Sequence, residues 1–196
     1  MSRGPNKKFE PEMALSKAME VFWARGYEAA SLSELLQNMG ISRKSMYDTF
    51  GNKQALFLKA LEYYAQTNLR LIKEQLLASG SPLRNIEQLL LSMQKTHGKS
   101  GSKGCLLGTC TADFDTSDVE IAPVLRSYFN RLENIYYEAI SRAQAAGELS
   151  KEASPRDLAR MLVCTTQGMA LVGRVLDSET IPTSVVLTTI KALKRM

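Results

Sequence analysis

The sequence is poor in the residues on which metal sites and many enzymes depend. Its 196 residues include one histidine, His97, and three cysteines, Cys105, Cys110 and Cys164. An odd number of cysteines argues against a disulfide scaffold, and a single histidine makes a zinc site unfavourable. A cysteine-based enzyme would need a base, and the sequence has neither a Gly-rich phosphate loop nor a nucleophile elbow. We therefore expect no enzymatic activity, no metal and no cofactor.

Long apolar runs are absent as well. No stretch approaches the ~18 consecutive apolar residues of a membrane helix, and residues 1–8 are polar and basic, unlike a secretory signal. The composition, 44% hydrophobic and 23% charged, is typical of a globular protein. We expect a cytoplasmic protein with no membrane partner. Its net charge of +5 is compatible with a polyanionic partner but does not establish one.

Helical periodicity is present along almost the whole chain. Apolar residues recur at helical spacing, as at Leu32, Leu35 and Met39, and we find no alternating strand pattern or internal repeat. The predicted helices span 9–26, 33–39, 43–49, 53–78, 82–97, 105–114, 118–146, 155–177 and 182–195. The sequence therefore predicts an all-α fold of about nine helices. We expect a compact N-terminal unit of three short helices at 1–52 and a larger helical bundle at 53–196.

Residues that favour helix starts support these boundaries. Ser31-x-x-Glu34 is a capping-box pattern ahead of an apolar run. Ser81 and Ser154 each stand directly before a proline, the preferred order at a helix start. The pattern predicts that these three serines cap helices.

The segment from Leu32 to Lys53 has the pattern of a helix-turn-helix. Gly40 can adopt the left-handed conformation that ends the first helix, and Ser42 can cap the second. Met46 and Phe50 lie one turn apart and must face the core. The side chains that then face outward are Arg43, Lys44, Ser45, Tyr47 and Asp48.

This outward face suits DNA, because cations, a hydroxyl and a phenol can reach base edges and phosphates. Lys53 opens the next helix, where its ammonium and the free N–H groups could hold a backbone phosphate. The alternative from spacing alone is that these are solvated charges on a small helix pair. A purely structural helical adaptor is the corresponding rival function, and it would show no salt-dependent affinity for DNA.

A family resemblance favours the DNA-binding interpretation. The segments that carry it are Ser31-Leu32-Ser33-Glu34-Leu35, Gly40-Ile41-Ser42-Arg43-Lys44-Ser45-Met46-Tyr47, Phe50 and Asn52-Lys53-Gln54-Ala55-Leu56-Phe57. Together they resemble the DNA-binding domain of TetR-family repressors over roughly residues 9 to 60. The Tyr-x-x-Phe-x-x-Lys spacing after Gly-Ile-Ser is specific to that family.

The resemblance implies an all-helical homodimer that represses transcription until a small molecule binds its C-terminal bundle. It also implies that Arg43, Lys44, Ser45 and Tyr47 contact DNA and that Lys53 contacts a phosphate. Residues 1–52 would then be the DNA-binding domain, and residues 53–196 the ligand-sensing and dimerisation domain. The candidate DNA-binding residues are Ser31, Ser33, Ser42, Arg43, Lys44, Ser45, Tyr47, Asp48, Thr49 and Lys53. Because one such unit reads only a few base pairs, we expect a dimer to bind a palindromic double-stranded operator.

Two positions depart from the family pattern. The family often has histidine where this sequence has Thr49, whose hydroxyl would hold a phosphate more weakly. Asp48 lies on the outward face, where phosphates repel a carboxylate. It could instead accept from a cytosine amine or orient Arg43 or Lys44.

The segment Gly104-Cys105-Leu106-Leu107 resembles a subgroup that includes regulators responding to electrophiles. If Cys105 opens a helix, the helix dipole and Lys103 would favour its reactive thiolate. Modification of Cys105 would then shift the bundle and separate the two DNA-reading heads. The alternative is that the cysteines are small apolar fillers, and we expect Cys110 and Cys164 to be core residues.

The C-terminal bundle could instead bind an apolar or aromatic inducer reversibly. The candidates for sensing a ligand or an electrophile are Cys105, Cys110, Phe114, Tyr128, Leu132, Met161, Cys164, Gln167 and Gly168. Broad apolar faces on the last two helices suggest a partner surface, and the resemblance places a dimer interface there. The candidate interface residues are Leu158, Leu162, Met169, Val172, Val185, Val186, Thr189 and Leu193. A core position is the alternative for several of them.

Overall fold

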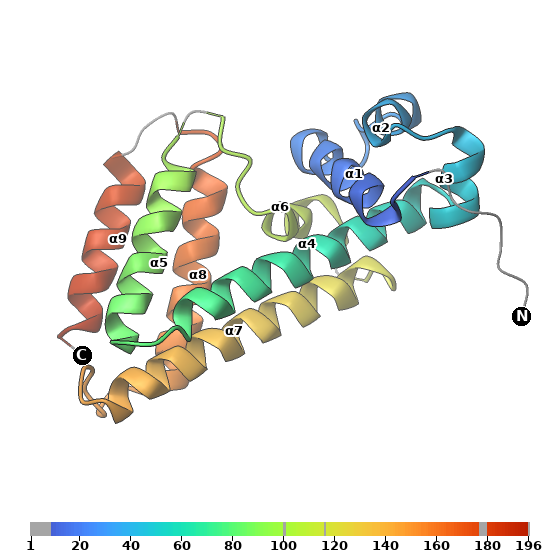
Figure 1. Cartoon of the computed structure of the whole chain (residues 1–196). Coiled ribbons are helices and arrows are strands. Elements are labelled where there is room, and N and C mark those ends of the chain that lie inside the picture. The colour runs from blue at the N-terminus through green and yellow to red at the C-terminus, as the bar shows by residue number, and fades with distance from the viewer. Residues whose placement is uncertain (1–8, 100, 116, 177–179, 196) are drawn as a thin grey trace, which may run out of the picture. The chain divides into compact units, whose positions relative to one another are not determined.

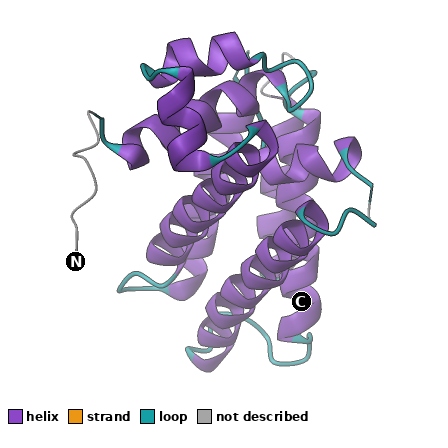
Figure 2. Ribbon diagram, turned by 90° about the vertical axis from the view of Figure 1, so that its right-hand side faces the viewer, coloured by secondary structure: helices purple, strands orange, loops and turns teal. Residues whose placement is uncertain are grey.

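The computed structural model describes residues 9–99, 101–115, 117–176 and 180–195. Within these ranges the chain forms nine α-helices joined by loops, without strands, which confirms the predicted all-α fold (Figure 2). The helices, labelled in Figure 1, are α1 (Pro11–Arg25), α2 (Leu32–Met39), α3 (Arg43–Phe50), α4 (Lys53–Leu76), α5 (Pro82–His97), α6 (Leu106–Asp113), α7 (Ile121–Ala145), α8 (Pro155–Val172) and α9 (Thr180–Leu193). None of them is long and apolar enough to cross a membrane.

The predicted serine caps are confirmed. The hydroxyl oxygens of Ser31, Ser81 and Ser154 each accept a hydrogen bond from the backbone N–H three residues further on, at 3.1–3.3 Å. Each bond satisfies one of the N–H groups that a helix start leaves without an intrahelical partner.

The predicted end of α8 is wrong, because the helix stops at Val172 and not at residue 177. Residue 177 itself lies outside the described residues. At Gly173, a Cβ atom would lie 2.3 Å from the carbonyl oxygen of His97 at the end of α5. Two segments distant in the sequence therefore meet closely just after α8, and periodicity within α8 gives no sign of this contact.

The chain packs as two compact units, residues 1–66 and 67–196, which we call unit 1 and unit 2. Packing thus divides the chain within α4, whereas the sequence sets a functional boundary at the start of that helix. The functional boundary stays a prediction.

Unit 1 has an aromatic core. The ring of Phe57 lies 4.9 Å from those of both Phe22 and Tyr27, measured between centroids. Trp23 packs edge-on against Tyr64 at 5.1 Å. These contacts hold the first half of α4 against α1 and against the loop that follows α1, and they stabilise the packing of unit 1.

Unit 2 contains the second half of α4 and helices α5 to α9. The end of α4 and α7 run in the same direction, because Tyr128 O–H donates to Asn68 Oδ1 (2.9 Å) and Arg142 donates to the carbonyl of Leu77 (3.1 Å). Helices α5, α8 and α9 stand side by side (Figure 1).

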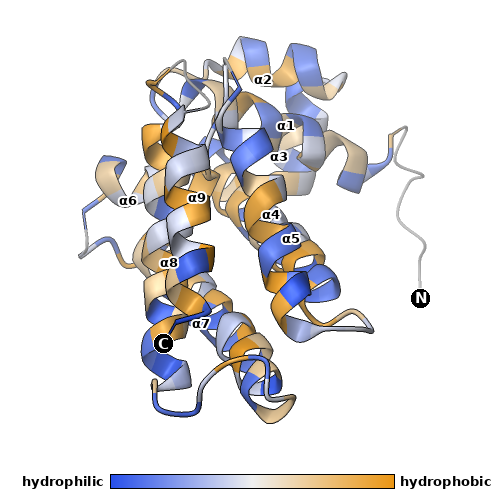
Figure 3. Cartoon of the chain, turned by 90° about the vertical axis from the view of Figure 1, so that its left-hand side faces the viewer, coloured by the Kyte–Doolittle hydropathy of each residue, from blue (hydrophilic) through white to orange (hydrophobic). Residues whose placement is uncertain are grey.

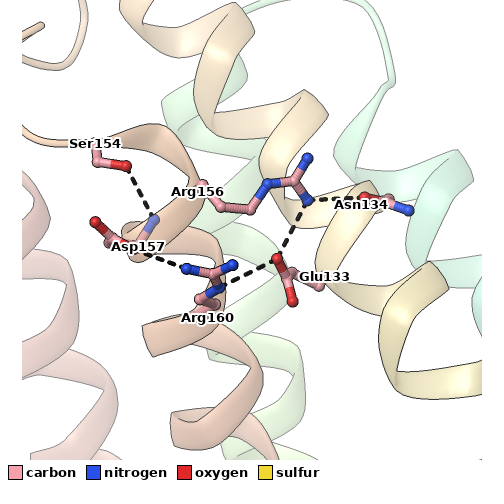
Figure 4. Close-up of polar contacts among 6 residues, drawn as sticks. All are labelled: Glu133, Asn134, Ser154, Arg156, Asp157 and Arg160. Atoms are coloured by element: carbon pink, nitrogen blue, oxygen red, sulfur yellow. Dashed lines mark hydrogen bonds and ion pairs between the residues drawn. The ribbon is translucent and has the colours of Figure 1, made fainter. Parts of the chain in front are cut away.

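A polar network ties the first turn of α8 to α7 (Figure 4). Glu133 Oε1 lies 3.2 Å from Arg156 Nη1 and 3.4 Å from Arg160 Nε. Arg156 also donates to Asn134 Oδ1 at 2.8 Å and lies over the ring of Tyr137 at 4.0 Å. These contacts orient the start of α8, the helix that carries four of the eight predicted dimer residues.

Candidate nucleic-acid interface

The turn between α2 and α3 has the geometry that the sequence predicts. Gly40 is left-handed, with φ 68° and ψ 32°, and its N–H donates to the carbonyl of Leu36 at 3.0 Å. Ser42 caps α3 by accepting from the N–H of Ser45 at 3.1 Å. A side chain other than glycine would strain the left-handed position, so Gly40 permits the abrupt change of direction between the two helices.

The orientation of α3 also agrees with the prediction. Met46 and Phe50 are buried, whereas Tyr47 is 47% exposed. The side chains of Arg43, Lys44 and Asp48 are exposed as well. Because α3 is anchored by its two apolar residues, the cations and the phenol are held on its solvent face.

Ser45 and Thr49 are less available than the sequence suggests, since both are half-buried. The hydroxyl of Ser45 lies 2.9 Å from that of Ser42, within hydrogen-bond distance. The two hydroxyls therefore bond to each other at the start of α3. Their role toward DNA stays a prediction, but a direct contact would have to share or replace this bond.

Lys53 is held in place by a residue that the sequence analysis missed. Its ammonium lies 4.6 Å from the centroid of the Tyr27 ring and 3.4 Å from the carbonyl oxygen of Glu28. Burial, and then the nearby charge of Glu28, raise the pKa of Tyr27 above its ordinary value, so the phenol stays neutral at physiological pH. Tyr27 stands 26 positions before Lys53 in the numbering, and no local spacing links the two.

The start of α4 also has the features of an anion-binding site. Asn52 Oδ1 accepts from the N–H of Ala55 at 2.8 Å, which caps the helix. Lys53 occupies the first helical position, so its cation and the positive end of the helix lie together. This arrangement suits a backbone phosphate.

Ser31 and Ser33 are exposed on α2, and Ser31 acts as its cap. The predicted capping box is only half formed. Glu34 Oε1 lies 3.2 Å from Arg25 Nε, so its carboxylate pairs with α1 in place of the Ser31 backbone. This ion pair joins the first two helices of unit 1.

In unit 2, Cys105 is the N-cap of α6, as the sequence predicts. Its sulfur accepts from the N–H of Gly108 at 3.4 Å and lies 3.6 Å from the hydroxyl of Tyr128. Tyr128 in turn donates to Asn68 on α4. The thiol is buried and is connected through Tyr128 to the helix that continues into unit 1.

The other two cysteines differ from each other. Cys110 is buried, as expected, and burial above all raises the pKa of its thiol to about 12, with Asp113 and Cys105 adding to the effect. Cys164 lies exposed on α8, so the prediction that it is a core residue is wrong. Cysteine usually fills apolar space, and residue type alone did not reveal this exception.

The remaining ligand candidates are spread over different parts of unit 2. Leu132 is buried, Gly168 is exposed, and Gln167 reaches α6, where a Cβ on Gly108 would lie 2.6 Å from its Oε1. Phe114 borders a hollow between α6 and α7, whereas Met161 borders a different groove between α8 and α9. Their shared role in one ligand pocket stays a prediction that this geometry does not favour.

The predicted dimer residues divide into two groups. Five are buried within their own subunit, in agreement with the core alternative: Leu158, Leu162, Met169, Val186 and Leu193. Val172 is exposed, and Val185 and Thr189 are half-buried beside Met161. Periodicity identified the apolar faces but not which of them the subunit itself covers.

Additional exposed apolar side chains lie on and between these helices. Leu171 is 52% exposed, Val175 83% and Leu187 57%. Orange segments on α8 and α9 mark their apolar residues in Figure 3. These three residues are not among the predicted interface residues, because the sequence shows that they are apolar but not that they are exposed.

Comparison with known proteins agrees with this architecture. Residues 14–60 match the model of bacterial regulatory proteins of the tetR family, and residues 82–188 match the tetracyclin repressor-like C-terminal domain. The chain is 33% identical over 150 residues to an uncharacterized HTH-type transcriptional regulator, YezE of Bacillus subtilis, covering 76% of this chain and 77% of that protein. It is 30% identical over 179 residues to the HTH-type transcriptional repressor ComR of Escherichia coli, covering 88% and 83%.

A solved structure extends the likeness to a DNA complex. It contains a cysteine mutant of the TetR family transcriptional regulator CifR bound to a 26-bp double-strand operator. The TM-score is 0.83 at 26% identity, over 97% of this chain and 100% of that one. Fold and interface together define a helix-turn-helix, DNA-binding transcriptional regulator. The chain belongs to the TetR family of bacterial regulatory proteins.

Proposed function

We propose that this protein is a homodimeric, cytoplasmic repressor, without catalytic activity, that binds a palindromic operator through α3. The observation that carries the proposal is the solvent face of α3, where Arg43, Lys44 and Tyr47 are exposed above the buried Met46 and Phe50. Lys53, held by Tyr27 at the start of α4, supplies a phosphate contact. The names of the relatives support repression, since ComR and BdcR of Escherichia coli are both described as repressors.

Selection of bound DNA from a random pool tests the operator proposal. A palindromic sequence with two half-sites should be enriched, and its affinity should fall as the salt concentration rises. Enrichment of no sequence, or binding that does not depend on salt, would contradict it and favour the helical adaptor.

Dimerisation is proposed to use the exposed apolar residues of α8 and α9. Leu171 and Leu187 are each more than half exposed, and an apolar surface of this kind is unfavourable in a lone subunit. Light scattering should find a dimer for the unchanged protein. Leu187→Glu should give a folded monomer that has lost most of its operator affinity, and a dimer that persists would move the interface elsewhere.

Release from DNA is proposed to start in unit 2, either by a bound small molecule or by modification of Cys105. The contacts from Cys105 through Tyr128 to Asn68 support a link between α6 and α4. Cys164 is exposed in the single subunit and lies seven residues from Leu171 on the same face of α8, so the proposed dimer would bring it to the interface, where alkylation would disturb dimerisation. The thiol route must therefore be tested with Cys164 replaced.

Iodoacetamide treatment of the Cys164→Ser variant separates the two routes. Loss of operator binding that Cys105→Ser prevents would support a thiol switch. Mass spectrometry must show that Cys105 is alkylated. If operator binding is then unchanged, the thiol switch is contradicted and release by a reversible ligand remains.

A further inference from the structure

A hollow of about 260 Å³ lies between the end of α6 and the first half of α7, within unit 2. Its apolar wall includes Phe114, Leu125 and Phe129. Leu125 is buried, and Phe129 is half-buried and packs edge-on against Tyr128 with ring centroids 5.2 Å apart. The wall is therefore formed by side chains with fixed positions. The volume is below the roughly 300–1,000 Å³ of pockets for drug-sized ligands, so a smaller molecule fits.

Four polar side chains line this hollow: Thr111, Asp115, Arg126 and Asn130. The hydroxyl of Thr111 donates to the carbonyl of Gly108 at 2.7 Å. Arg126 and Asn130 are both exposed and are four residues apart on α7, so they are neighbours on one face of the helix. The same face continues through Leu125 and Phe129 into the hollow. A molecule whose apolar body lies in the hollow would place its polar group beside these two side chains.

Two side chains on the rim, Arg126 and Asn130, can donate hydrogen bonds, whereas Asp115 can only accept. Asp115 Oδ1 accepts from the N–H and from the hydroxyl of Ser117, both at 2.7 Å. These bonds keep the pKa of Asp115 below its ordinary value, so the carboxylate is ionised and one of its two oxygens already has partners. Arg126 has no hydrogen bond or ion pair among the residues that the structure describes, and neither has Asn130.

From these observations we propose that the hollow binds a small monocarboxylate with an apolar body. The body packs against Phe114, Leu125 and Phe129, where burial of apolar surface stabilises it. The carboxylate accepts two parallel hydrogen bonds from the Arg126 guanidinium, whose planar fork matches its geometry, and a third from the Asn130 amide. A second carboxylate on the ligand would be repelled by Asp115, which favours monoacids over diacids.

Three probes with the same six-carbon body separate the contributions in titration calorimetry: hexanoate, 1-hexanol and adipate. We expect hexanoate to bind at least about tenfold more tightly than either of the others, because a charge-assisted pair adds to the same apolar contact. Arg126→Gln should weaken hexanoate binding by about tenfold or more and leave 1-hexanol unchanged. Phe129→Ala should weaken both.

The control is Arg131→Gln, an exposed arginine on the same helix that does not border the hollow. It should leave hexanoate binding unchanged. Equal binding of hexanoate and 1-hexanol, or hexanoate binding that survives Arg126→Gln, would overturn the inference and make Arg126 an ordinary solvated side chain.

The biological role of this ligand rests on the proposed function, and its failure is distinguishable from failure of the site. Hexanoate should weaken operator binding by the unchanged protein. It should leave operator binding by the Arg126→Gln variant unchanged. If calorimetry finds no hexanoate binding while the ligand-free protein binds its operator, the ligand inference is wrong and the DNA-binding proposal stands. If the ligand-free protein binds no operator, the proposed function is wrong, whatever calorimetry finds.

Discussion

The two units differ in whether they bury polar side chains. The buried side chains of unit 1 are apolar or aromatic, and the side chains predicted to read DNA, Arg43, Lys44 and Tyr47, lie exposed on α3. Unit 2 contains all three buried polar residues of the described chain, Asn85, Gln144 and Thr166, and also the contact between Cys105 and Tyr128. In unit 1 the side chains that read DNA are therefore not the ones that hold the fold. In unit 2 polar contacts are part of the packed core.

The largest effect should come from removing the exposed DNA-reading side chains. Replacing both Lys44 and Tyr47 by Ala should weaken operator binding on the order of a hundredfold to a thousandfold, at roughly 1–3 kcal/mol per lost contact. Because both side chains are exposed, the melting temperature should stay within experimental error. Fluorescence anisotropy and calorimetry measure the two quantities.

Lys73→Ala is the matched control for charge, since Lys73 is exposed on the part of α4 that belongs to unit 2. It should change operator affinity far less. Unfolding of the Lys44→Ala, Tyr47→Ala double variant would contradict this difference between the units, because DNA binding and folding would then depend on the same side chains. Normal binding by that variant would refute the assignment of α3.

The next effect should be a loss of stability in unit 2. Tyr128→Phe removes the hydroxyl that donates to Asn68 and contacts the Cys105 sulfur. A buried hydrogen bond of this kind contributes about 1–2 kcal/mol, so the melting temperature should fall by a few degrees. Differential scanning calorimetry measures the change.

Tyr137→Phe tests whether any tyrosine hydroxyl on α7 would have the same effect. Tyr137 is exposed, and its ring can keep the contact with Arg156 after the hydroxyl is removed. Its melting temperature should not change. If Tyr128→Phe is equally neutral, polar contacts and packing are separable in unit 2 as well.

The same difference explains what the sequence could predict. In unit 1 the function depends on residues close together in the chain, so Gly40, Ser42, Met46 and Phe50 were enough to orient α3. In unit 2 the decisive contacts join distant segments. The residue after α8, Gly173, lies against the carbonyl of His97, and the exposure of Cys164 depends on which neighbours cover α8.

The dimer residues show the same limit. Leu162 and Leu193 share helical periodicity with exposed positions, but other helices of the same subunit cover them. Tyr27 is the one comparable omission in unit 1, and it too acts on a residue distant in sequence. Local sequence pattern therefore predicted the helices and the DNA-facing side of α3. Tertiary contacts decide which residues of α8 and α9 are exposed and how Lys53 is held.

Alkaline pH should destabilise unit 2 through its buried acids. Burial raises the pKa of Cys110 from 9.0 to about 12 and that of Tyr136 from 10.0 to about 12. A raised pKa of a neutral acid stabilises the folded state below the unfolded pKa, and this contribution is lost as the pH rises from about 9 toward 12. Denaturant unfolding at increasing pH should show a falling free energy of unfolding above about pH 9.

Cys110→Ala separates this effect from general alkaline damage. The variant loses some packing, but its free energy of unfolding should depend less steeply on pH between about 9 and 10.5. An unchanged slope would mean that the thiol is not the titrating group. At neutral pH, mass spectrometry should also find Cys110 unmodified by an alkylating reagent, because a thiol with a pKa of about 12 supplies almost no thiolate.

The smallest effect should come from the ion pairs, where the two units are most alike. Glu133→Gln weakens the contacts with Arg156 and Arg160 in unit 2, and Arg25→Gln removes the pair with Glu34 in unit 1. Arg160 and Arg25 are about equally exposed, so solvent screens both interactions, and each substitution should cost less than about 1 kcal/mol in denaturant unfolding. A clearly larger cost for Glu133→Gln would show that the network at the start of α8 depends on its half-buried partner Arg156, and the difference between the units would then extend from their cores to their surfaces.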